Sequence, residues 1–221
     1  MIFPRPVRAV VFDMDGLLIN SEVVIRDAMM ATARDMGAEL PHEVFVRMVG
    51  LTYAASDAVA QAHFGAEFPL ADFNAEVWRR AQAVFEAEDI LKDGVREIVD
   101  HLAAANIPRA VATSSSHDSV RRHLEPPGVY ARFQAIVARG DYERGKPSPD
   151  PFLVAAERLG VAAADCLALE DSHNGVRAAH AAGMMTVMVP DLLEPTDEMR
   201  RLCLAIADTL HDVREALERM A

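Results

Sequence analysis

Two aspartates at alternating positions follow the first apolar run of the sequence. Asp13 and Asp15 come directly after Ala9–Phe12, and Gly16 then permits a turn that can bring both carboxylates to one ligand. Two carboxylates that lie close together repel each other, and a divalent cation beside them removes the repulsion. A plain turn after a strand explains the same residues equally well. Taken alone, this segment leaves a metal site and a turn as open alternatives.

Polar side chains also follow three later apolar runs of the chain. In order they are Thr113 with Ser114, then Lys146 in a loop beside a proline, then Glu170 with Asp171. Helix capping, a solvated lysine and helix-dipole complementarity explain each feature separately. However, ligands of an open α/β sheet bind beyond the carboxyl ends of its strands. The joint arrangement therefore predicts a site for Mg2+ and for a phosphate group.

Five short apolar runs predict the strands that position these groups. Runs this short, apolar on both faces, are typical of buried parallel strands. They are Ala9–Phe12, Ala110–Ala112, Ala135–Ala138, Leu167–Leu169 and Thr186–Val189. Segments with helical spacing lie between them, two of which stop at Gly160 and Gly183. This alternation predicts an α/β fold, a Rossmann-like doubly wound parallel sheet.

The segment from Asn20 to Leu91 interrupts the alternation. It has helical periodicity and no convincing strand, and its more than 70 residues are too many for a single strand-to-helix connection. We therefore predict a Rossmann-like catalytic core of residues 1–19 and 92–221, and an inserted all-helical cap domain of residues 20–91. The methionine and aromatic residues of the insert, including Phe73 and Trp78, are expected to form its packed core.

Composition excludes several kinds of partner. The 221 residues carry a formal net charge of -12, and no basic run is longer than a pair. Nucleic acid and anionic membranes are therefore not expected partners, although an anionic small substrate stays possible. We find no signal peptide, and no apolar stretch approaches the roughly 20 residues of a membrane span. Two cysteines in a chain of this length suggest a reducing compartment. A cytoplasmic location is the resulting expectation, and a monomer is taken as the default because the sequence carries no signal for the oligomeric state.

The segment Val10–Leu18 resembles the first motif of haloacid dehalogenase-like (HAD) hydrolases. Thr113, Lys146 and the pair Glu170–Asp171 are similar to the second, third and fourth motifs, in order and with suitable spacing. The similarity covers almost the whole chain and implies a Rossmann-like core with a helical cap. The pattern is closest to the β-phosphoglucomutase-like group, especially its sugar-phosphate and pseudouridine-5′-phosphate phosphatases. The runs that carry this closer similarity are Phe12–Leu18, Ala112–Ser115 and Val187–Asp191.

The resemblance implies a role for each acidic motif residue. Asp13 would attack phosphorus and become an aspartyl phosphate. Asp15 would protonate the leaving oxygen and then activate water for the second step. Asp13 and Asp171 would bind Mg2+ together with the Asp15 backbone carbonyl, and Glu170 would be a ligand or a support of the ligands.

The remaining motif residues would bind the phosphoryl group. Thr113, the backbone of Ser114 and Lys146 would hold its oxygens and stabilise charge in the transition state. The activity implied is hydrolysis of a small phosphorylated metabolite. Substrate selection is expected in the loop near Gly50–Ala54, with Arg47 or Tyr53 involved.

Some positions depart from the family pattern and bear on alternatives. Asn20 replaces a common aspartate, although asparagine can still cap the helix that follows. Ile25 and Tyr53 stand near the positions where phosphoglucomutases of this type carry a histidine and an arginine, which favours transfer to water over mutase activity. Residues 20–91 contain no lysine for the Schiff base of a phosphonate hydrolase. A sugar-phosphate mutase and a phosphorylatable receiver or binding module stay as alternatives.

Overall fold

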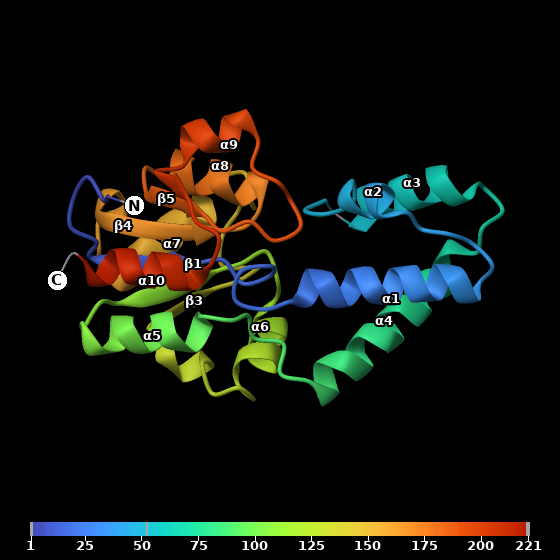
Figure 1. Ribbon diagram of the computed structural model, residues 1–221, viewed down its shortest axis with the longest axis horizontal. Coiled ribbons are helices and arrows are strands. Elements are labelled where there is room, and N and C mark those ends of the chain that lie inside the picture. Colours follow the sequence, from blue (N-terminus) through green and yellow to red (C-terminus); the bar gives the residue numbers. More distant parts are fainter. Residues whose placement is uncertain (1, 52, 220–221) are drawn as a thin grey trace. The chain divides into compact units, whose positions relative to one another are not determined.

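The predicted apolar runs form neighbouring strands of one parallel sheet (Figure 1). The structure is a computed structural model that describes residues 2–51 and 53–219. Within these residues six strands lie in the order β3-β2-β1-β4-β5-β6, and every neighbouring pair is parallel. Their bounds are β1 Ala9–Phe12, β2 Arg109–Ala112, β3 Ala135–Val137, β4 Cys166–Glu170, β5 Met185–Met188 and β6 Ala205–Ile206. The order places β1 between β2 and β4, so the chain reverses direction across the sheet at β1.

The predicted strands agree with the observed ones to within one residue at each end. The first has the expected bounds, whereas β4 extends one residue further in both directions. The sequence did not predict β6, because a run of two residues carries no recognisable pattern. Its partner β5 fixes it in the sheet by pairing Val187 with Ala205 and Met188 with Ile206.

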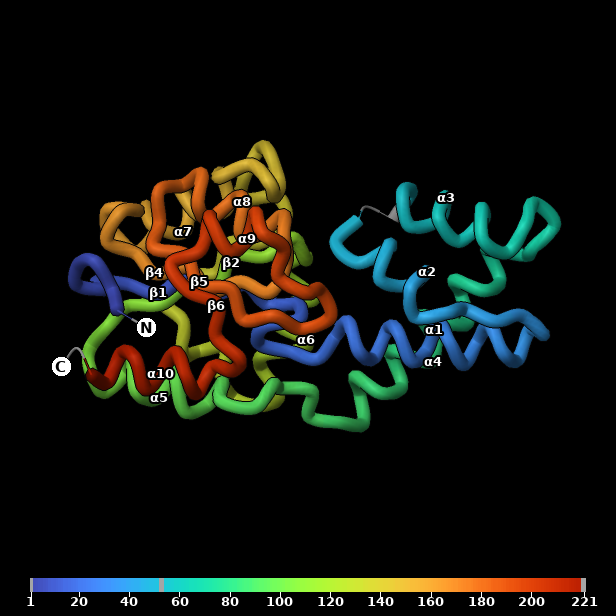
Figure 2. The backbone as a smooth tube through the Cα atoms, turned by 45° about the horizontal axis from the view of Figure 1, so that its top comes forward, coloured from blue at the N-terminus to red at the C-terminus, as the bar shows by residue number. Residues whose placement is uncertain are grey.

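Helices cover both faces of the sheet, which confirms the predicted doubly wound α/β fold. In Figures 1 and 2, α7 and α8 lie on one face, and α5 and α10 pack together on the opposite face. The helices between and after the strands are α5 Val95–Ala104, α6 His117–Leu124, η1 Tyr130–Arg132, α7 Asp150–Leu159, η2 Ala163–Asp165, α8 His173–Ala181, α9 Asp197–Leu202 and α10 Leu210–Glu218. Of the helices in the described part of the chain, none combines the length and the apolar character needed to cross a bilayer.

Small side chains of the sheet form the core under α7 and α8. Ala9 and Val11 of β1 point to this face with Ala168 of β4, all fully buried. Phe152 of α7 fills the space that these small residues leave. Full burial of such a ring stabilises the fold by about 1.5–3 kcal/mol relative to exposure. Phe12, the next residue along β1, contacts Phe133 edge to face with ring centroids 5.8 Å apart.

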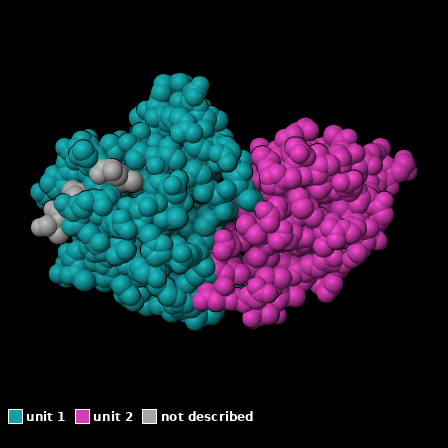
Figure 3. Space-filling view, viewed as in Figure 1, with its two compact units in different colours: residues 1–19, 91–221 teal, residues 20–90 magenta. Residues whose placement is uncertain are grey.

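The chain divides into two compact units, shown in different colours in Figure 3. Unit 1 comprises residues 1–19 and 91–221, and unit 2 comprises residues 20–90. The boundary lies one residue before the predicted one, because Leu91 forms an antiparallel bridge with Ile19. Within unit 2, the Asn20 N–H donates to the Ile90 carbonyl at 2.8 Å. The insert therefore begins and ends at adjacent points.

Helices joined by turns and loops form unit 2, and no strand occurs among its described residues. Its helices are α1 Ser21–Asp35, α2 His42–Val46, α3 Tyr53–Phe64 and α4 Leu70–Ala87. Helix α1 packs on α4, which buries Phe73 and Ala81. The expectation that Trp78 belongs to the packed core was wrong, because this residue is 43% exposed. Asn20 occupies the N-cap position of α1, but its side chain makes no capping hydrogen bond. The expectation that Asn20 caps this helix through its side chain was therefore wrong.

Candidate active site

The loop after β1 carries the two predicted aspartates. The Asp13 N–H donates to the Leu169 carbonyl at 3.0 Å, so Asp13 continues the pairing of β1 with β4. Gly16 follows at a φ of +84°, a backbone conformation that side chains with a Cβ rarely adopt. A Cβ at Gly16 would lie 2.1 Å from Oδ2 of Asp171. Only glycine therefore allows this loop to approach the Asp171 carboxylate.

Lys146 joins the first motif to the fourth. Its ammonium group donates hydrogen bonds to Oδ1 of Asp13 and, at 2.5 Å, to Oε1 of Glu170. The side chain is 8% exposed, and its Nζ lies 5.1 Å from the centre of the Phe152 ring. Lys146, which the sequence placed only in a loop beside a proline, is thus buried between the carboxylates of Asp13, after β1, and Glu170, at the end of β4.

Burial and neighbouring charges together set the pKa values of Lys146 and Asp13. Burial alone would lower the pKa of Lys146, but the Asp13 and Glu170 carboxylates outweigh it and raise that pKa above its usual range. Burial is also the main reason why the pKa of Asp13 is raised to about 8, an effect that Lys146 opposes and that Glu170 and Asp15 reinforce. Three carboxylates, those of Asp13, Glu170 and Asp171, lie around one ammonium group here, so a cation would be stabilised at this site and would favour the ionised form of Asp13.

Hydroxyl groups after β2 hold Asp15. Ser115 Oγ donates to Oδ2 of Asp15 at 2.8 Å, and Thr113 Oγ1 approaches the same oxygen at 3.3 Å. Thr113 is fully buried, and its carbonyl accepts a hydrogen bond from the Tyr142 hydroxyl at 3.0 Å. Ser114 lies in the same turn with its side chain exposed. The sequence predicted Thr113 and Ser114 but not Ser115 or Tyr142.

The sequence did not predict the hydroxyl contacts of Ser115 and Tyr142, for two different reasons. Ser115 lies within the run Ser114–Ser116, where three equal side chains give no reason to prefer one. Ser116 serves as the N-cap of α6 and accepts a hydrogen bond from the Ser119 N–H. Tyr142 lies 29 positions from Thr113, and only the packing of the folded loops shows that they meet.

Three carboxylates gather at the ends of β1 and β4. Asp13, Glu170 and Asp171 each offer an oxygen, and these atoms all lie within 4.8 Å of one another. All three residues are buried. The side chain of Asp15 is not part of this trio, so its predicted contribution through the backbone carbonyl stays a prediction.

The trio has the donor chemistry that Mg2+ requires. Its atoms are hard carboxylate oxygens, the ligand type that this ion prefers, and they are few enough to leave positions for water and phosphate. The missing Cβ of Gly16 keeps the approach to Asp171 open. The residues present therefore fit a magnesium ion, and the division of roles among the three carboxylates stays a prediction.

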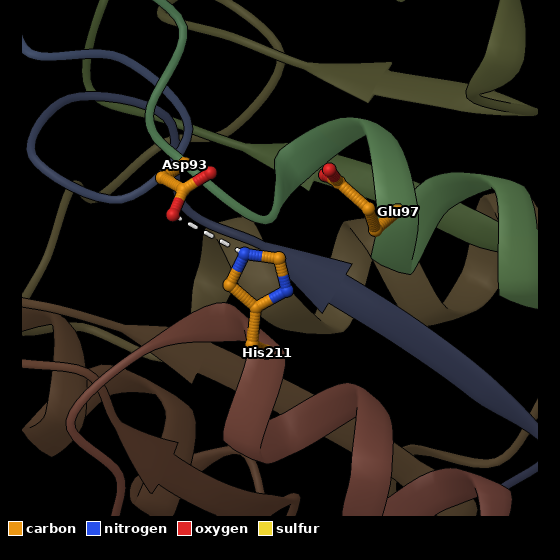
Figure 4. A group of neighbouring side chains, drawn as sticks. All are labelled: Asp93, Glu97 and His211. Atoms are coloured by element: carbon orange, nitrogen blue, oxygen red, sulfur yellow. Dashed lines mark ion pairs between the residues drawn. The ribbon is translucent and has the colours of Figure 1, made fainter.

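A second group of potential ligands lies outside this site, between α5 and α10. It consists of Asp93, Glu97 and His211 (Figure 4), with His211 Nε2 3.3 Å from Oδ2 of Asp93. Asp93 precedes α5 and Glu97 lies in its first turn, where negative charge stabilises a helix N-terminus. This role accounts for the group, and we assign it no ligand.

The structure describes only some of the residues that were predicted to select the substrate. Arg47 follows α2 and is exposed. Thr52 and the side chain of Tyr53, which belong to the predicted loop near Gly50–Ala54, lie outside the described residues.

Comparisons with known proteins agree with the geometry. A family model described as haloacid dehalogenase-like hydrolase matches residues 7–183. The chain is 35% identical over 217 residues to "Probable pseudouridine-5'-phosphatase" of Drosophila melanogaster, with 92% of each chain covered. It is 29% identical to "Phosphorylated carbohydrates phosphatase" of Thermotoga maritima, over 80% of this chain and 82% of that one.

A solved structure extends the similarity to three dimensions. It is a HAD family hydrolase from Deinococcus radiodurans R1 with bound phosphate and sodium, 27% identical. The TM-score is 0.83, and the match covers 97% of this chain and 96% of that one. The family match, the parallel sheet and the motif residues at its carboxyl edge agree: the chain belongs to the haloacid dehalogenase-like hydrolases and is an enzyme of their phosphatase group.

Proposed function

We propose that this enzyme is a Mg2+-dependent phosphatase that hydrolyses a small phosphorylated metabolite through an aspartyl-phosphate intermediate. The observation that carries the proposal is the placement of Lys146, whose ammonium group bonds both Asp13 and Glu170 beside Asp171. A buried carboxylate can act as the nucleophile on a phosphate ester, and a lysine and a metal site beside it can stabilise the charge of the transferred phosphoryl group.

In the first step, a carboxylate oxygen of Asp13 attacks phosphorus. The bond from phosphorus to the ester oxygen breaks, and the leaving alkoxide takes a proton from Asp15. We assign this proton to Oδ1 of Asp15, because the hydroxyls of Ser115 and Thr113 approach Oδ2. These two contacts fix the carboxyl group in one orientation, which lowers the entropic cost of reaching the productive geometry.

In the second step, Asp15 accepts a proton from water, and the resulting hydroxide attacks the phosphorus of phosphorylated Asp13. The bond from phosphorus to Asp13 breaks, inorganic phosphate leaves, and both carboxyl groups regain their starting states. One carboxyl group therefore acts as acid and then as base, while the other carries the phosphoryl group.

Charge stabilisation in both steps is assigned to the remaining motif residues. Lys146, Thr113 and the backbone N–H of Ser114 would hold the oxygens of the transferred phosphoryl group. A magnesium ion on Asp13 and Asp171 would supply further positive charge for these oxygens. When phosphate enters, Lys146 can exchange part of its contact with Asp13 for contact with the phosphoryl group.

The names of two relatives support a proposal for the substrate class. The Drosophila relative is named for pseudouridine-5′-phosphate and the Thermotoga relative for phosphorylated carbohydrates. We propose esters of this kind, a nucleoside monophosphate or a sugar phosphate, as the substrates of this chain. We further propose that unit 2, residues 20–90, acts as the cap that selects among them.

The proposal is tested by phosphate release from a panel of such esters, with Mg2+ and with EDTA. Asp13→Asn should lower kcat by at least about 1,000-fold, since loss of a nucleophile costs several orders of magnitude. Asp208→Asn, which removes the same charge from an exposed position of unit 1, serves as the control.

Residual activity of Asp13→Asn above about one per cent of wild type would argue against the covalent route. Release that is unchanged in EDTA would argue against the metal. If no ester releases phosphate, isomerisation of a sugar phosphate and the lifetime of phosphorylated Asp13 distinguish the mutase from the receiver.

A further inference from the structure

Asp191 is a nearly buried carboxylate in the loop that follows β5. Its side chain is 11% exposed, and Oδ1 accepts a hydrogen bond from Nζ of Lys92 at 2.6 Å. The Lys92 side chain is itself only 20% exposed. An ion pair so far removed from water costs desolvation on both sides, so it is not equivalent to the surface pairs of the same chain.

Both partners are attached to the segments that carry the candidate site. The Lys92 N–H donates to the Leu18 carbonyl at 2.9 Å, so Lys92 is held against the loop that follows Asp15. The Val189 N–H, two residues before Asp191, donates to the Glu170 carbonyl at 2.7 Å. The pair therefore joins the loop after β1 to the loop after β5, next to the end of β4.

The second oxygen of Asp191 is the informative atom. Oδ2 is buried and has no hydrogen-bond partner among the residues that the structure describes. An ionised oxygen in such a position is costly unless a donor or a cation satisfies it. The carboxylates of Asp191 and Asp171 also offer oxygens within 4.8 Å of each other, which adds like-charge repulsion.

One occupant would satisfy both conditions. A hydrated cation on Asp171 offers positive charge for the pair of carboxylates, and its water offers the donor that Oδ2 of Asp191 lacks. A structural ion pair with Lys92 does not require this arrangement, because Lys92 already neutralises Asp191 through Oδ1.

We infer that Asp191 is a positioning residue of the magnesium site: Lys92 fixes its Oδ1, and its Oδ2 accepts a hydrogen bond from water of the cation that Asp171 holds. The inference rests on the proposed function, since it requires that Asp171 binds Mg2+. It assigns to Lys92 the task of orienting Asp191, in the way that outer partners orient the ligands of other metal sites.

The test is titration of the resting protein with Mg2+ by isothermal calorimetry, without substrate. Asp191→Asn keeps the size of the side chain and an acceptor for Lys92 but removes the charge. It should weaken Mg2+ binding about 10- to 100-fold, the usual cost of losing such a partner. Asp208→Asn is the matched control, and its affinity should stay within about twofold of wild type.

Each outcome decides between a positioning role and a structural one. If the pair of Lys92 and Asp191 is only structural, Asp191→Asn will lower the resistance to urea and leave the Mg2+ affinity unchanged. That result overturns the inference while leaving the proposed function intact. If wild type itself binds no Mg2+, the proposed function fails, and the inference fails with it. Asp191→Glu, which restores the charge, should recover part of the affinity.

A further variant covers a failure to fold. If circular dichroism shows that Asp191→Asn is unfolded, the same titration is made with Asp191→Ser, whose smaller side chain leaves room for water. Weakened Mg2+ binding by folded Asp191→Ser supports the inference, and unchanged binding overturns it.

Discussion

Glu170 and Asp171 are adjacent in the chain, yet their surroundings assign them different tasks. Oε1 of Glu170 accepts from Lys146, and Oε2 accepts from the backbone N–H groups of Asp171 and Ser172 and from the Ser172 hydroxyl. These contacts occupy most of the acceptor capacity of the carboxylate. We therefore assign Glu170 to holding Lys146 in place, and Asp171 to direct contact with the metal.

The position of Glu170 depends on Gly175, because the absence of a side chain there leaves space for the Glu170 carboxylate. A Cβ at Gly175 would lie 1.9 Å from Cδ and Oε1 of Glu170 and 2.0 Å from Oε2, distances that no structure tolerates. Gly175→Ala should favour helix α8 locally but displace Glu170 and with it Lys146. We expect kcat to fall at least about 100-fold, since a shift of about 1 Å at a catalytic group has this cost.

Gly145→Ala provides the control for that substitution. Gly145 precedes Lys146, and its added Cβ would meet Tyr142 at 3.7 Å, an ordinary van der Waals contact. Its activity, measured as phosphate release under the same conditions, should stay close to wild type. Equal activity of the two variants would contradict the assignment of Glu170.

At the scale of the elements, alternation of apolar runs and helical spacing was enough to predict the fold class and five of the six strands found in the described part of the chain. It could not give the order of the strands, because order depends on which crossovers pack on which face. The same limit applies to the site. Asp13 and Lys146 were predictable because motifs carry them, whereas Ser115 and Tyr142 are defined by contacts between loops that lie far apart in sequence.

Asp141 shows how one loop residue fixes several elements. Its Oδ2 accepts from the Ala138 N–H after β3 at 3.0 Å, from Arg158 of α7 at 3.0 Å, and lies 2.9 Å from Nε2 of His117 at the start of α6. The hydrogen bond from Arg158 is the main reason why the pKa of Asp141 is lowered to about 2.

This shift predicts a pH-dependent contribution to stability. Because the pKa is lower in the folded state than its ordinary 3.8, the contribution is complete above about pH 4 and is lost as the pH falls towards 2. Asp141→Asn should lower the free energy of unfolding by about 1 kcal/mol at pH 7, after allowance for solvent screening. Urea unfolding of both proteins at pH 7, 5, 4 and 3 should show the difference shrinking below pH 4. A difference that is constant with pH would refute the role of the charge.

At the scale of the whole molecule, unit 1 contains its own hydrophobic core. The cluster of small strand residues under α7 and α8 draws all its members from residues 9–19 and 91–221. The ends of the insert are adjacent, because Ile19 pairs with Leu91. Closing the gap with a short linker therefore costs little loop entropy.

Replacing residues 20–90 with a linker of a few Gly and Ser residues should accordingly leave unit 1 folded. Circular dichroism during heating should show one cooperative transition, and calorimetry should still detect Mg2+ binding. We expect discrimination between phosphate esters to be lost, since the proposed selector is removed. A broad transition without cooperativity would show that unit 1 depends on unit 2 for its fold.

The adjacency of Ile19 and Leu91 also has a consequence for descent. A segment whose two ends leave its host side by side can be exchanged for another segment in a single recombination event, without rethreading the sheet. Related enzymes with the same catalytic residues can then acquire new substrate preferences by exchange of the inserted segment, while those residues stay unchanged.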